Sequence, residues 1–303
     1  MGKTVFLFPG QGSQGVGMGK NLYEKYQVAR DVFKEAEDVL KIPLQKICFE
    51  GPSEELTLTQ NTQPALLTVS TAMARVLESE TEIRADLVCG HSLGEYSALV
   101  QAGALFFSDA LMAVRARGEA MQEAVPVGKG AMAALIGGEA DQVEALCQRV
   151  TQEMGSGELV VPANFNGGGQ VVVSGTQKAV EKTVEISKSH GIRRAVLLEV
   201  SAPFHSPLMQ PAADRMKEVL EKIKFHTPKI PYIANVDAKI YKDETQMKTC
   251  LIRQIPNPVQ WEKSMQLLDT EGITHAYEVG PGKVLTGLLR RINKNIQVED
   301  FSL

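Results

Sequence analysis

The sequence contains few residues of the kind that form disulfides or metal sites. Its 303 residues include four cysteines and five histidines. The cysteines are Cys48, Cys89, Cys147 and Cys250; they are far apart, and they form no CxxC pair and have no histidine at metal-ligand spacing. We therefore expect reduced, mostly buried thiols and no metal site.

Long hydrophobic runs and an excess of positive charge are also missing. The apolar run at residues 5–8 is too short for a signal peptide or a membrane span. A formal net charge of -4 argues against a general nucleic-acid binder, which concentrates Lys and Arg to neutralise phosphates. We therefore expect a cytoplasmic protein, a monomer by default, that binds neither nucleic acid nor a membrane.

Both ends of the chain alternate between strand and helix patterns. Residues 3–8 predict a strand that runs into a glycine-rich turn, and helical patterns follow over 21–40 and 61–77. A short strand at 85–90 precedes a helix at 93–103 that is rich in small residues. Beyond Pro203 we predict helices at 207–223 and 246–254 and strands at 230–235 and 274–279, and the tail from Gly280 closes the larger domain.

Residues 128–198 follow a different rhythm. Strands are predicted at 131–136, 159–165, 171–174 and 195–200, and helices at 139–154 and 176–190. This β-α-β-β-α-β order is that of a ferredoxin-like unit. We therefore expect an α/β protein in which this subdomain (128–198) is inserted into a larger domain (1–127 and 199–303).

The strongest chemical motif is Gly90-His91-Ser92-Leu93-Gly94, which matches G-x-S-x-G between a predicted strand and a predicted helix. This is the context of a nucleophile elbow, a sharp turn that lifts a serine hydroxyl out of the sheet. A serine that only caps the following helix is the other interpretation. We take Ser92 as the candidate nucleophile.

A serine nucleophile needs a general base, normally a histidine. The His91 side chain should point away from that of Ser92, and the other candidates sit in polar or strand-edge surroundings: His190, His226 and His275. His205 follows a strand that ends in a proline turn, within the sequence SAPFHS. It is therefore the candidate base, and a purely structural histidine is the alternative.

Backbone amides could complete such a site as an oxyanion hole. The turn Gly10-Gln11-Gly12 can offer N–H groups to a cleft, and the amide of Leu93 is the natural second donor. A phosphate-binding loop over residues 10–19 is the weaker interpretation, because the segment lacks the GK[ST] ending and has no acidic residue placed for a ribose.

Several motifs in order identify a resemblance. With GQGSQ, QNTQPA, GHSLGEYSAL, RARG, ANFN, SAPFHS, NPVQW and EVGPGKVL, the chain resembles bacterial malonyl-CoA:acyl carrier protein transacylases over nearly its whole length. The resemblance implies an α/β-hydrolase-like large domain with a ferredoxin-like insert. It also implies ping-pong transfer of a malonyl group from malonyl-CoA to acyl carrier protein, in fatty-acid or polyketide biosynthesis. Coenzyme A enters as a thioester substrate, and no cofactor is implied.

The resemblance also assigns catalytic roles. It places the nucleophile on Ser92 and the base on His205, which the main-chain carbonyl of Gln254 would orient. The carboxylate-binding arginine falls on Arg117, whose guanidinium could pair bidentately with a malonyl carboxylate. The residues alone favour a different interpretation of Arg117, as a surface arginine in an ion pair.

The remaining roles concern the substrate cleft. The resemblance places Gln11 and Leu93 at the oxyanion hole and three residues along the cleft, namely Gln63, His91 and Asn164. Phe204 should crowd a methyl branch on the substrate and so disfavour methylmalonyl. One departure is the run Gly167-Gly168-Gly169 where the family has a proline, which predicts a more mobile loop.

Two other functions remain open. A serine thioesterase or esterase would use the same elbow, and a non-catalytic scaffold that binds carrier protein could share the fold.

Docking of an acidic carrier protein or of the phosphates of coenzyme A needs positive charge. Two basic clusters could provide it, although ordinary solvated helix faces would explain them equally well. They are Lys178, Lys182, Lys188, Arg193 and Arg194, and then Arg290, Arg291 and Lys294.

Overall fold

The computed structural model describes residues 2–200 and 202–299. Ser201, the first residue of the SAPFHS motif, lies outside the described residues, as do Met1 and residues 300–303 at the predicted ends of the large domain. Within the described ranges, none of the helices has the length and apolar character that a membrane span requires.

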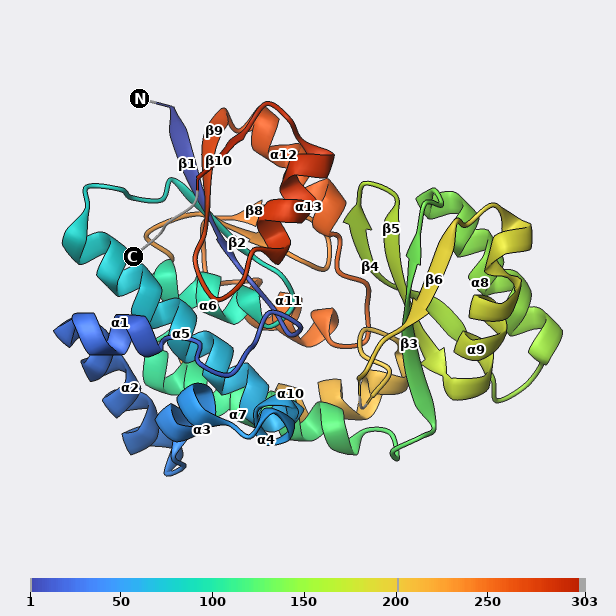
Figure 1. Ribbon diagram of the computed structural model, residues 1–303, viewed down its shortest axis with the longest axis horizontal. Helices are drawn as coiled ribbons and strands as arrows, with labels where there is room; N and C mark the ends of the chain where they lie inside the picture. The colour runs from blue at the N-terminus through green and yellow to red at the C-terminus, as the bar shows by residue number, and fades with distance from the viewer. Residues whose placement is uncertain (1, 201, 300–303) are drawn as a thin grey trace.

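A mostly parallel sheet forms the centre of the larger part of the molecule (Figure 1). In the described chain its strand order is β10-β9-β1-β2-β7-β8, and all pairings are parallel except that of β8 on the edge. Parallel strands end at one edge of the sheet, so the loops after β1 and β2 meet there. The strands are β1 (Lys3–Phe8), β2 (Leu87–Gly90), β7 (Tyr232–Ala234), β8 (Lys239–Tyr241), β9 (Ile273–Glu278) and β10 (Gln297–Glu299).

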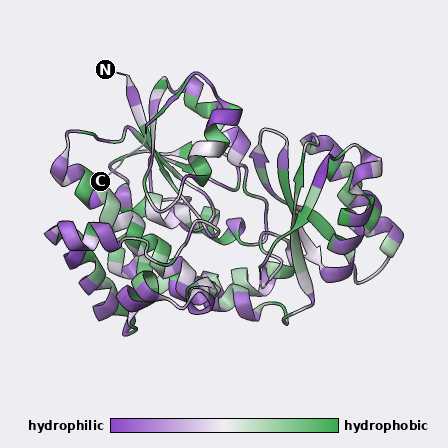
Figure 2. Cartoon of the chain, viewed as in Figure 1, coloured by the Kyte–Doolittle hydropathy of each residue, from purple (hydrophilic) through white to green (hydrophobic). Residues whose placement is uncertain are grey.

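Helices cover both faces of this sheet, because successive strand residues point to opposite sides. Phe6 and Phe8 face one hydrophobic cluster, and Val5 and Leu7 face another. Figure 2 shows hydrophobic residues on the central strands and hydrophilic residues on the outer helices. The second cluster packs under α12 (Trp261–Thr270) and α13 (Val284–Ile292). The first cluster packs under the other helices of this part: α1 (Lys20–Lys25), α2 (Gln27–Leu40), α3 (Leu44–Glu50), α4 (Ser53–Thr57), α5 (Thr59–Glu80), α6 (Gly94–Gln101), α7 (Phe107–Glu123), η2 (Pro207–Met209), α10 (Gln210–Glu221) and α11 (Met247–Gln254).

The middle of the chain forms a second, smaller part beside the first (Figure 1). Its elements have the predicted β-α-β-β-α-β order, and its antiparallel sheet has the strand order β4-β5-β3-β6. A hydrophobic cluster of its own lies between this sheet and two helices. The elements are β3 (Gly130–Ile136), α8 (Ala140–Met154), β4 (Val160–Gly167), β5 (Gln170–Thr176), α9 (Gln177–Ile186), η1 (Ser187–His190) and β6 (Arg194–Leu197).

Backbone hydrogen bonds join the two parts along one edge of β4. The N–H of Phe165 donates to the carbonyl of Val259 at 3.0 Å, and the N–H of Val259 donates to the carbonyl of Ala163 at 2.9 Å. Asn164 forms the bridge with Val259 between these bonds. The smaller sheet therefore contacts the larger part just after α11.

Several predicted elements differ in extent. The single helix predicted over 21–40 is broken at Tyr26, whose extended backbone (φ -119°, ψ 128°) separates α1 from α2. The strand predicted over 195–200 ends at Leu197, where its pairing with β3 ends. The sequence pattern predicted no bounds for the segments that form α3, α4, α7, β8, α12, α13 and β10.

The glycine run 167–169 forms the turn between β4 and β5. All three residues have positive φ, of 77°, 59° and 74°, as in the tight turns of β-hairpins. Proline has φ fixed near -65°, so it could not adopt the conformation of Gly168. The turn therefore differs from one built on proline, while the predicted mobility stays a prediction.

Candidate active site

The G-x-S-x-G motif forms a sharp turn between β2 and α6. Ser92 has φ 52°, in the left-handed region that is strained for a non-glycine residue. A Cβ on Gly90 would lie 1.9 Å from the carbonyl oxygen of Gly94, and one on Gly94 would lie 2.0 Å from that of Phe8. Both positions therefore need glycine. The N-cap residue of α6 is Leu93, and the Ser92 hydroxyl contacts His205 and Arg117 instead of the helix, so the helix-cap interpretation is wrong.

His205 contacts the Ser92 hydroxyl directly. Its Nε2 lies 2.8 Å from Ser92 Oγ, and its Nδ1 lies 2.9 Å from the main-chain oxygen of Gln254. Because a carbonyl can only accept, Nδ1 carries the proton and Nε2 is free to accept from the serine. Burial, and after it the nearby Arg117 charge, lower the pKa of His205 to about 3. The imidazole is therefore neutral at ordinary pH.

Arg117 lies beside the same hydroxyl and is only 1% exposed. Its Nη2 donates to Ser92 Oγ at 3.0 Å and to Gln254 Oε1 at 2.8 Å, and its Nη1 donates to Gln63 Oε1 at 2.9 Å. Its Nε is buried without a hydrogen-bond partner in the described chain, and no carboxylate there forms an ion pair with it. The interpretation of Arg117 as a surface ion-paired arginine is therefore wrong.

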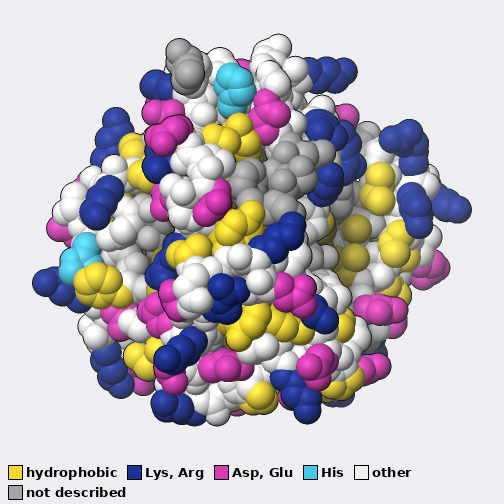
Figure 3. Space-filling view, turned by 60° about the vertical axis from the view of Figure 1, so that its left-hand side comes forward, with side chains coloured by type: hydrophobic (Ala, Val, Ile, Leu, Met, Phe, Trp, Pro, Cys, Tyr) yellow, Lys and Arg dark blue, Asp and Glu magenta, His cyan; other side chains and the backbone are white. Residues whose placement is uncertain are grey.

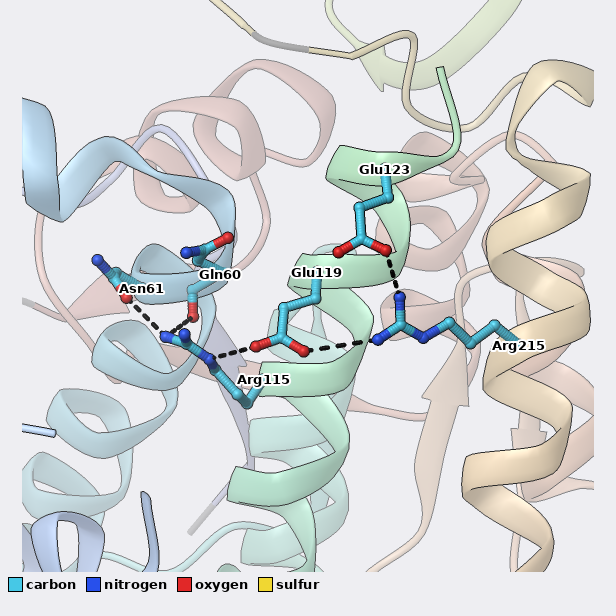
Figure 4. Close-up of polar contacts among 6 residues, drawn as sticks. All are labelled: Gln60, Asn61, Arg115, Glu119, Glu123 and Arg215. Atoms are coloured by element: carbon cyan, nitrogen blue, oxygen red, sulfur yellow. Dashed lines mark hydrogen bonds and ion pairs between the residues drawn. The ribbon is translucent and has the colours of Figure 1, made fainter. Parts of the chain in front are cut away.

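Polar contacts fix the helix that carries Arg117 (Figure 4). Arg115 lies two residues before Arg117 on α7. It donates to Asn61 Oδ1 at 2.7 Å and to the carbonyl of Gln60 at 3.2 Å, both on α5. On the other side, Arg215 of α10 pairs with Glu119 at 3.6 Å and with Glu123 at 2.6 Å. These contacts tie α7 to α5, which bears Gln63, and to α10.

These groups open into a cleft of about 570 Å³ between the two sheets. Figure 3 shows a hollow between the two parts, with Lys and Arg side chains around it. The structure brings nearly all the sequence-predicted site residues to its lining: Gln11, Gln63, His91, Ser92, Leu93, Arg117, Asn164, Phe204 and His205. Gln254 is outside this lining, but its main-chain oxygen contacts His205 and its side-chain oxygen accepts from Arg117.

Two cleft amides are placed as the sequence suggested. Gln11 and Leu93 both line the cleft, and neither backbone N–H has a hydrogen-bond partner within the described residues. The side chain of Gln11 reaches away towards Thr59 Oγ1 at 3.5 Å. Both N–H groups are therefore available to an oxyanion.

The other histidines have different surroundings. The Nε2 of His91 lies 2.9 Å from Asn166 Oδ1, and its ring packs 5.4 Å from that of Trp261. His190, His226 and His275 do not line the cleft. His205 is therefore the histidine that contacts Ser92.

Sequence reasoning missed three polar residues of the site. Asn235 accepts from the N–H of Ser92 at 2.6 Å, and Asn166 lines the cleft beside His91. Glu95 is fully buried on α6, and burial raises its pKa to about 7. A signal existed for Asn235, since it ends a predicted strand at the same sheet edge as Ser92.

Comparison with known proteins agrees with this geometry. Residues 5–300 match the family described as "Acyl transferase domain". The chain belongs to this family. The resemblance that the motifs predicted is confirmed.

This acyl transferase domain has named relatives over nearly its full length. It is 50% identical over 297 residues to the malonyl CoA-acyl carrier protein transacylase of Bacillus subtilis (strain 168), which covers 98% of this chain and 92% of that protein. The acyl-carrier-protein-S-malonyltransferase of Bartonella henselae superposes with TM-score 0.94 at 48% identity, over 98% of this chain and 95% of that one.

A third relative was solved with a partner. It is a malonyl-transacylase in complex with a holo type II PKS acyl-carrier protein, and it superposes with TM-score 0.95 at 42% identity, over 99% of this chain and 96% of that one. The mixed α/β fold with its mostly parallel sheet is thus shared with solved acyltransferases.

We predict that His205 makes the stability of this acyl transferase domain depend on pH. The folded chain keeps the imidazole neutral to about pH 3, whereas an unfolded chain protonates it near pH 6.5. Because only the unfolded state binds this proton, the free energy of unfolding should fall as pH falls below that value, by about 1.4 kcal/mol per pH unit.

Urea unfolding of the wild type and of His205→Gln between pH 4 and 8 measures this contribution. Groups common to both proteins cancel in the difference between their free energies of unfolding. The free energy of unfolding of the wild type should fall relative to that of His205→Gln as pH falls below about 6.5. A difference that is constant with pH would contradict the assignment.

Proposed function

We propose that this acyl transferase domain moves a malonyl group from malonyl-CoA to the phosphopantetheine thiol of an acyl carrier protein, with Ser92 carrying the group between them. The observation that carries the proposal is the buried guanidinium of Arg117, 3.0 Å from Ser92 Oγ. A guanidinium pairs bidentately with a carboxylate. A malonyl group is an acyl group with a free carboxylate, and the named relatives are malonyl transacylases.

The domain organisation belongs to the same proposal. Residues 1–127 and 199–303 form an α/β-hydrolase-like domain, and 128–198 form a ferredoxin-like insert. The hydrophobic cluster between the smaller sheet and its helices contains only residues of the insert, which supports the division. So does the order β4-β5-β3-β6, in which each crossover helix joins two strands that flank a third. The boundary at 198/199 falls just after β6.

Acylation of Ser92 is the first step. His205 Nε2 accepts the hydroxyl proton as Ser92 Oγ attacks the thioester carbonyl, and the amides of Gln11 and Leu93 hold the oxyanion. The tetrahedral intermediate collapses, the C–S bond breaks, and the coenzyme A sulfur takes the proton from His205. The carbonyl of Gln254 holds the imidazole in the required tautomer throughout.

Transfer to the carrier protein reverses these roles. The phosphopantetheine thiol enters the same cleft and gives its proton to His205 while its sulfur attacks the ester carbonyl. The C–O bond to Ser92 breaks, and Ser92 Oγ takes the proton back. Since coenzyme A leaves before the carrier thiol enters the same cleft, the kinetics are ping-pong.

Arg117 provides the selectivity for a carboxylated acyl group. Its Nε has no partner in the described chain and can donate to an incoming carboxylate. Gln63 and Gln254 hold the fork through their amide oxygens. In this proposal His91 and Asn164 line the acyl pocket, and Phe204, 7% exposed at its wall, crowds a methyl branch.

Basic residues at the cleft provide the docking surface for an acidic carrier protein and for coenzyme A phosphates. Arg291 is exposed and lines the cleft, and Arg290 and Lys294 are exposed next to it on and after α13. The other cluster lies on the insert and comprises Lys178, Lys182, Lys188, Arg193 and Arg194, none of which lines the cleft. The position of Arg291 makes the α13 cluster the first to test.

We predict that Arg291→Glu lowers kcat/KM for the carrier protein about tenfold at low salt, because rim charges steer association. The matched control is Lys34→Glu, the same charge reversal at an exposed position on α2. The loss should shrink as salt rises. An equal loss in both variants would contradict docking at α13.

We predict that Ser92→Ala gives no malonyl adduct and that His205→Ala slows adduct formation by about 10³-fold or more. Intact-protein mass spectrometry after mixing with malonyl-CoA reads out both. An adduct that forms at the wild-type rate in either variant would refute the proposed function.

We predict that Arg117→Ala lowers the ratio of malonyl to acetyl transfer by about 10²-fold or more, because a buried carboxylate without its partner costs several kcal/mol. Competition between malonyl-CoA and acetyl-CoA for Ser92 measures the ratio. Arg115→Ala on the same helix is the control and should keep the ratio, since its contacts face α5 and Glu119. An unchanged ratio in Arg117→Ala would contradict the proposal that Arg117 binds the acyl carboxylate.

A further inference from the structure

The carboxylate of Glu95 lies directly behind the nucleophile turn. It is in the first turn of α6, three residues after Ser92, and is completely buried. Its Oε2 accepts from the backbone N–H of Asn235 at 3.0 Å and from Gln254 Nε2 at 2.8 Å. Its Oε1 is buried without a hydrogen-bond partner in the described part of the chain. The burial of a carboxylate is costly, so these two hydrogen bonds largely decide where it sits.

Both partners of Glu95 also hold the peptide groups of Ser92. Asn235 Oδ1 accepts from the N–H of Ser92 at 2.6 Å, and Asn235 Nδ2 donates to the carbonyl of Gly90 at 2.6 Å. Gln254 Nε2 donates to the carbonyl of Ser92 at 3.0 Å. A non-glycine residue keeps a left-handed backbone only when its surroundings over-determine it. Here both flanking peptide groups of the strained residue are held by the side chains of Asn235 and Gln254. Glu95 accepts from the backbone N–H of the first and from the side-chain amide of the second.

Glu95 also decides which way the Gln254 amide faces. In the structure Gln254 Oε1 accepts from Arg117, and its Nε2 faces Glu95 Oε2 and the Ser92 carbonyl. If the amide were turned over, its oxygen would face two other acceptors and its NH₂ would face the guanidinium, which cannot accept. The acceptor oxygen of Glu95 therefore fixes the end of the amide that holds Arg117.

We propose that Glu95 is a positioning residue for malonyl transfer, which sets the geometry of the Ser92 turn and of the Arg117 fork through Asn235 and Gln254. This inference rests on the proposed function only for its selectivity readout. Holding Asn235 and Gln254 in place requires a correctly placed acceptor oxygen at residue 95 but not its negative charge.

Two conservative variants separate these requirements. Glu95→Gln keeps the length and one acceptor oxygen but removes the charge. Glu95→Asp keeps the charge but shortens the side chain by one methylene, so its oxygen cannot keep both contacts. Glu95→Met has the same length without a strong acceptor, and it keeps the test decisive if Glu95→Asp does not fold. Ser97→Ala is the control, since the buried hydroxyl of Ser97 on the same helix has no hydrogen-bond partner among the described residues.

The first readout is labelling of Ser92 by a fluorophosphonate, which needs no malonyl substrate. Glu95→Gln should label close to the wild-type rate, and Glu95→Asp and Glu95→Met should label about 10²-fold more slowly, the cost of a misplacement near 1 Å. The second readout is the ratio of malonyl to acetyl adduct, which should fall in the same two variants. Thermal unfolding confirms that each protein compared is folded.

The outcomes are distinguishable from failure of the proposed function. If the wild type labels with fluorophosphonate but forms no malonyl adduct, the proposed function fails and the labelling series still tests Glu95. Wild-type labelling and selectivity in Glu95→Asp and Glu95→Met would overturn the inference. A Glu95→Gln variant as defective as Glu95→Asp would also overturn it, because the acceptor oxygen without the negative charge would then be insufficient.

Discussion

The strained turn at Ser92 is the constraint on which the site depends. A left-handed backbone at a serine is unfavourable by about 1–3 kcal/mol, and the turn leaves no room for a Cβ at Gly90 or Gly94. The parallel pairing of β1 with β2, which matches Phe8 with Gly90, brings the loop that contains Gln11 to the same sheet edge. One backbone geometry thus places the Ser92 hydroxyl, the Leu93 amide at the N-cap of α6 and the Gln11 amide on the loop after β1 at one cleft.

A second constraint is the buried positive charge of Arg117. Its guanidinium is held by the side-chain oxygens of Gln63, Gln254 and Ser92, and the described chain offers it no ion-paired carboxylate. Neutral acceptors position the fork but leave its charge uncompensated. A ligand that brings a carboxylate completes the site, whereas an uncharged acyl group leaves the cation buried and unpaired. This asymmetry is the physical basis of the proposed preference for malonyl groups.

Local pattern predicted much of the fold and the sharp turn at Ser92. The elbow was readable because glycine spacing and the strand-to-helix context are local properties of residues 85–103, and the middle subdomain was readable from its order of strands and helices. Arg117 was not, because its burial depends on α5 and α11, which are distant in sequence, and spacing alone favoured a surface arginine. Glu95 and Asn235 were missed for the same reason, since their partners come from other elements. The motif resemblance supplied Arg117 and Gln254.

The most direct test of the account is the fate of an isolated malonyl-enzyme. The adduct, freed of malonyl-CoA, is divided between buffer and a solution of phosphopantetheinylated carrier protein, and mass spectrometry follows both proteins. The account predicts that the malonyl group moves to the carrier thiol much faster than it is lost to water. Release as free malonate at the same rate with and without the carrier protein would contradict it, and would make the chain a hydrolase on the same elbow.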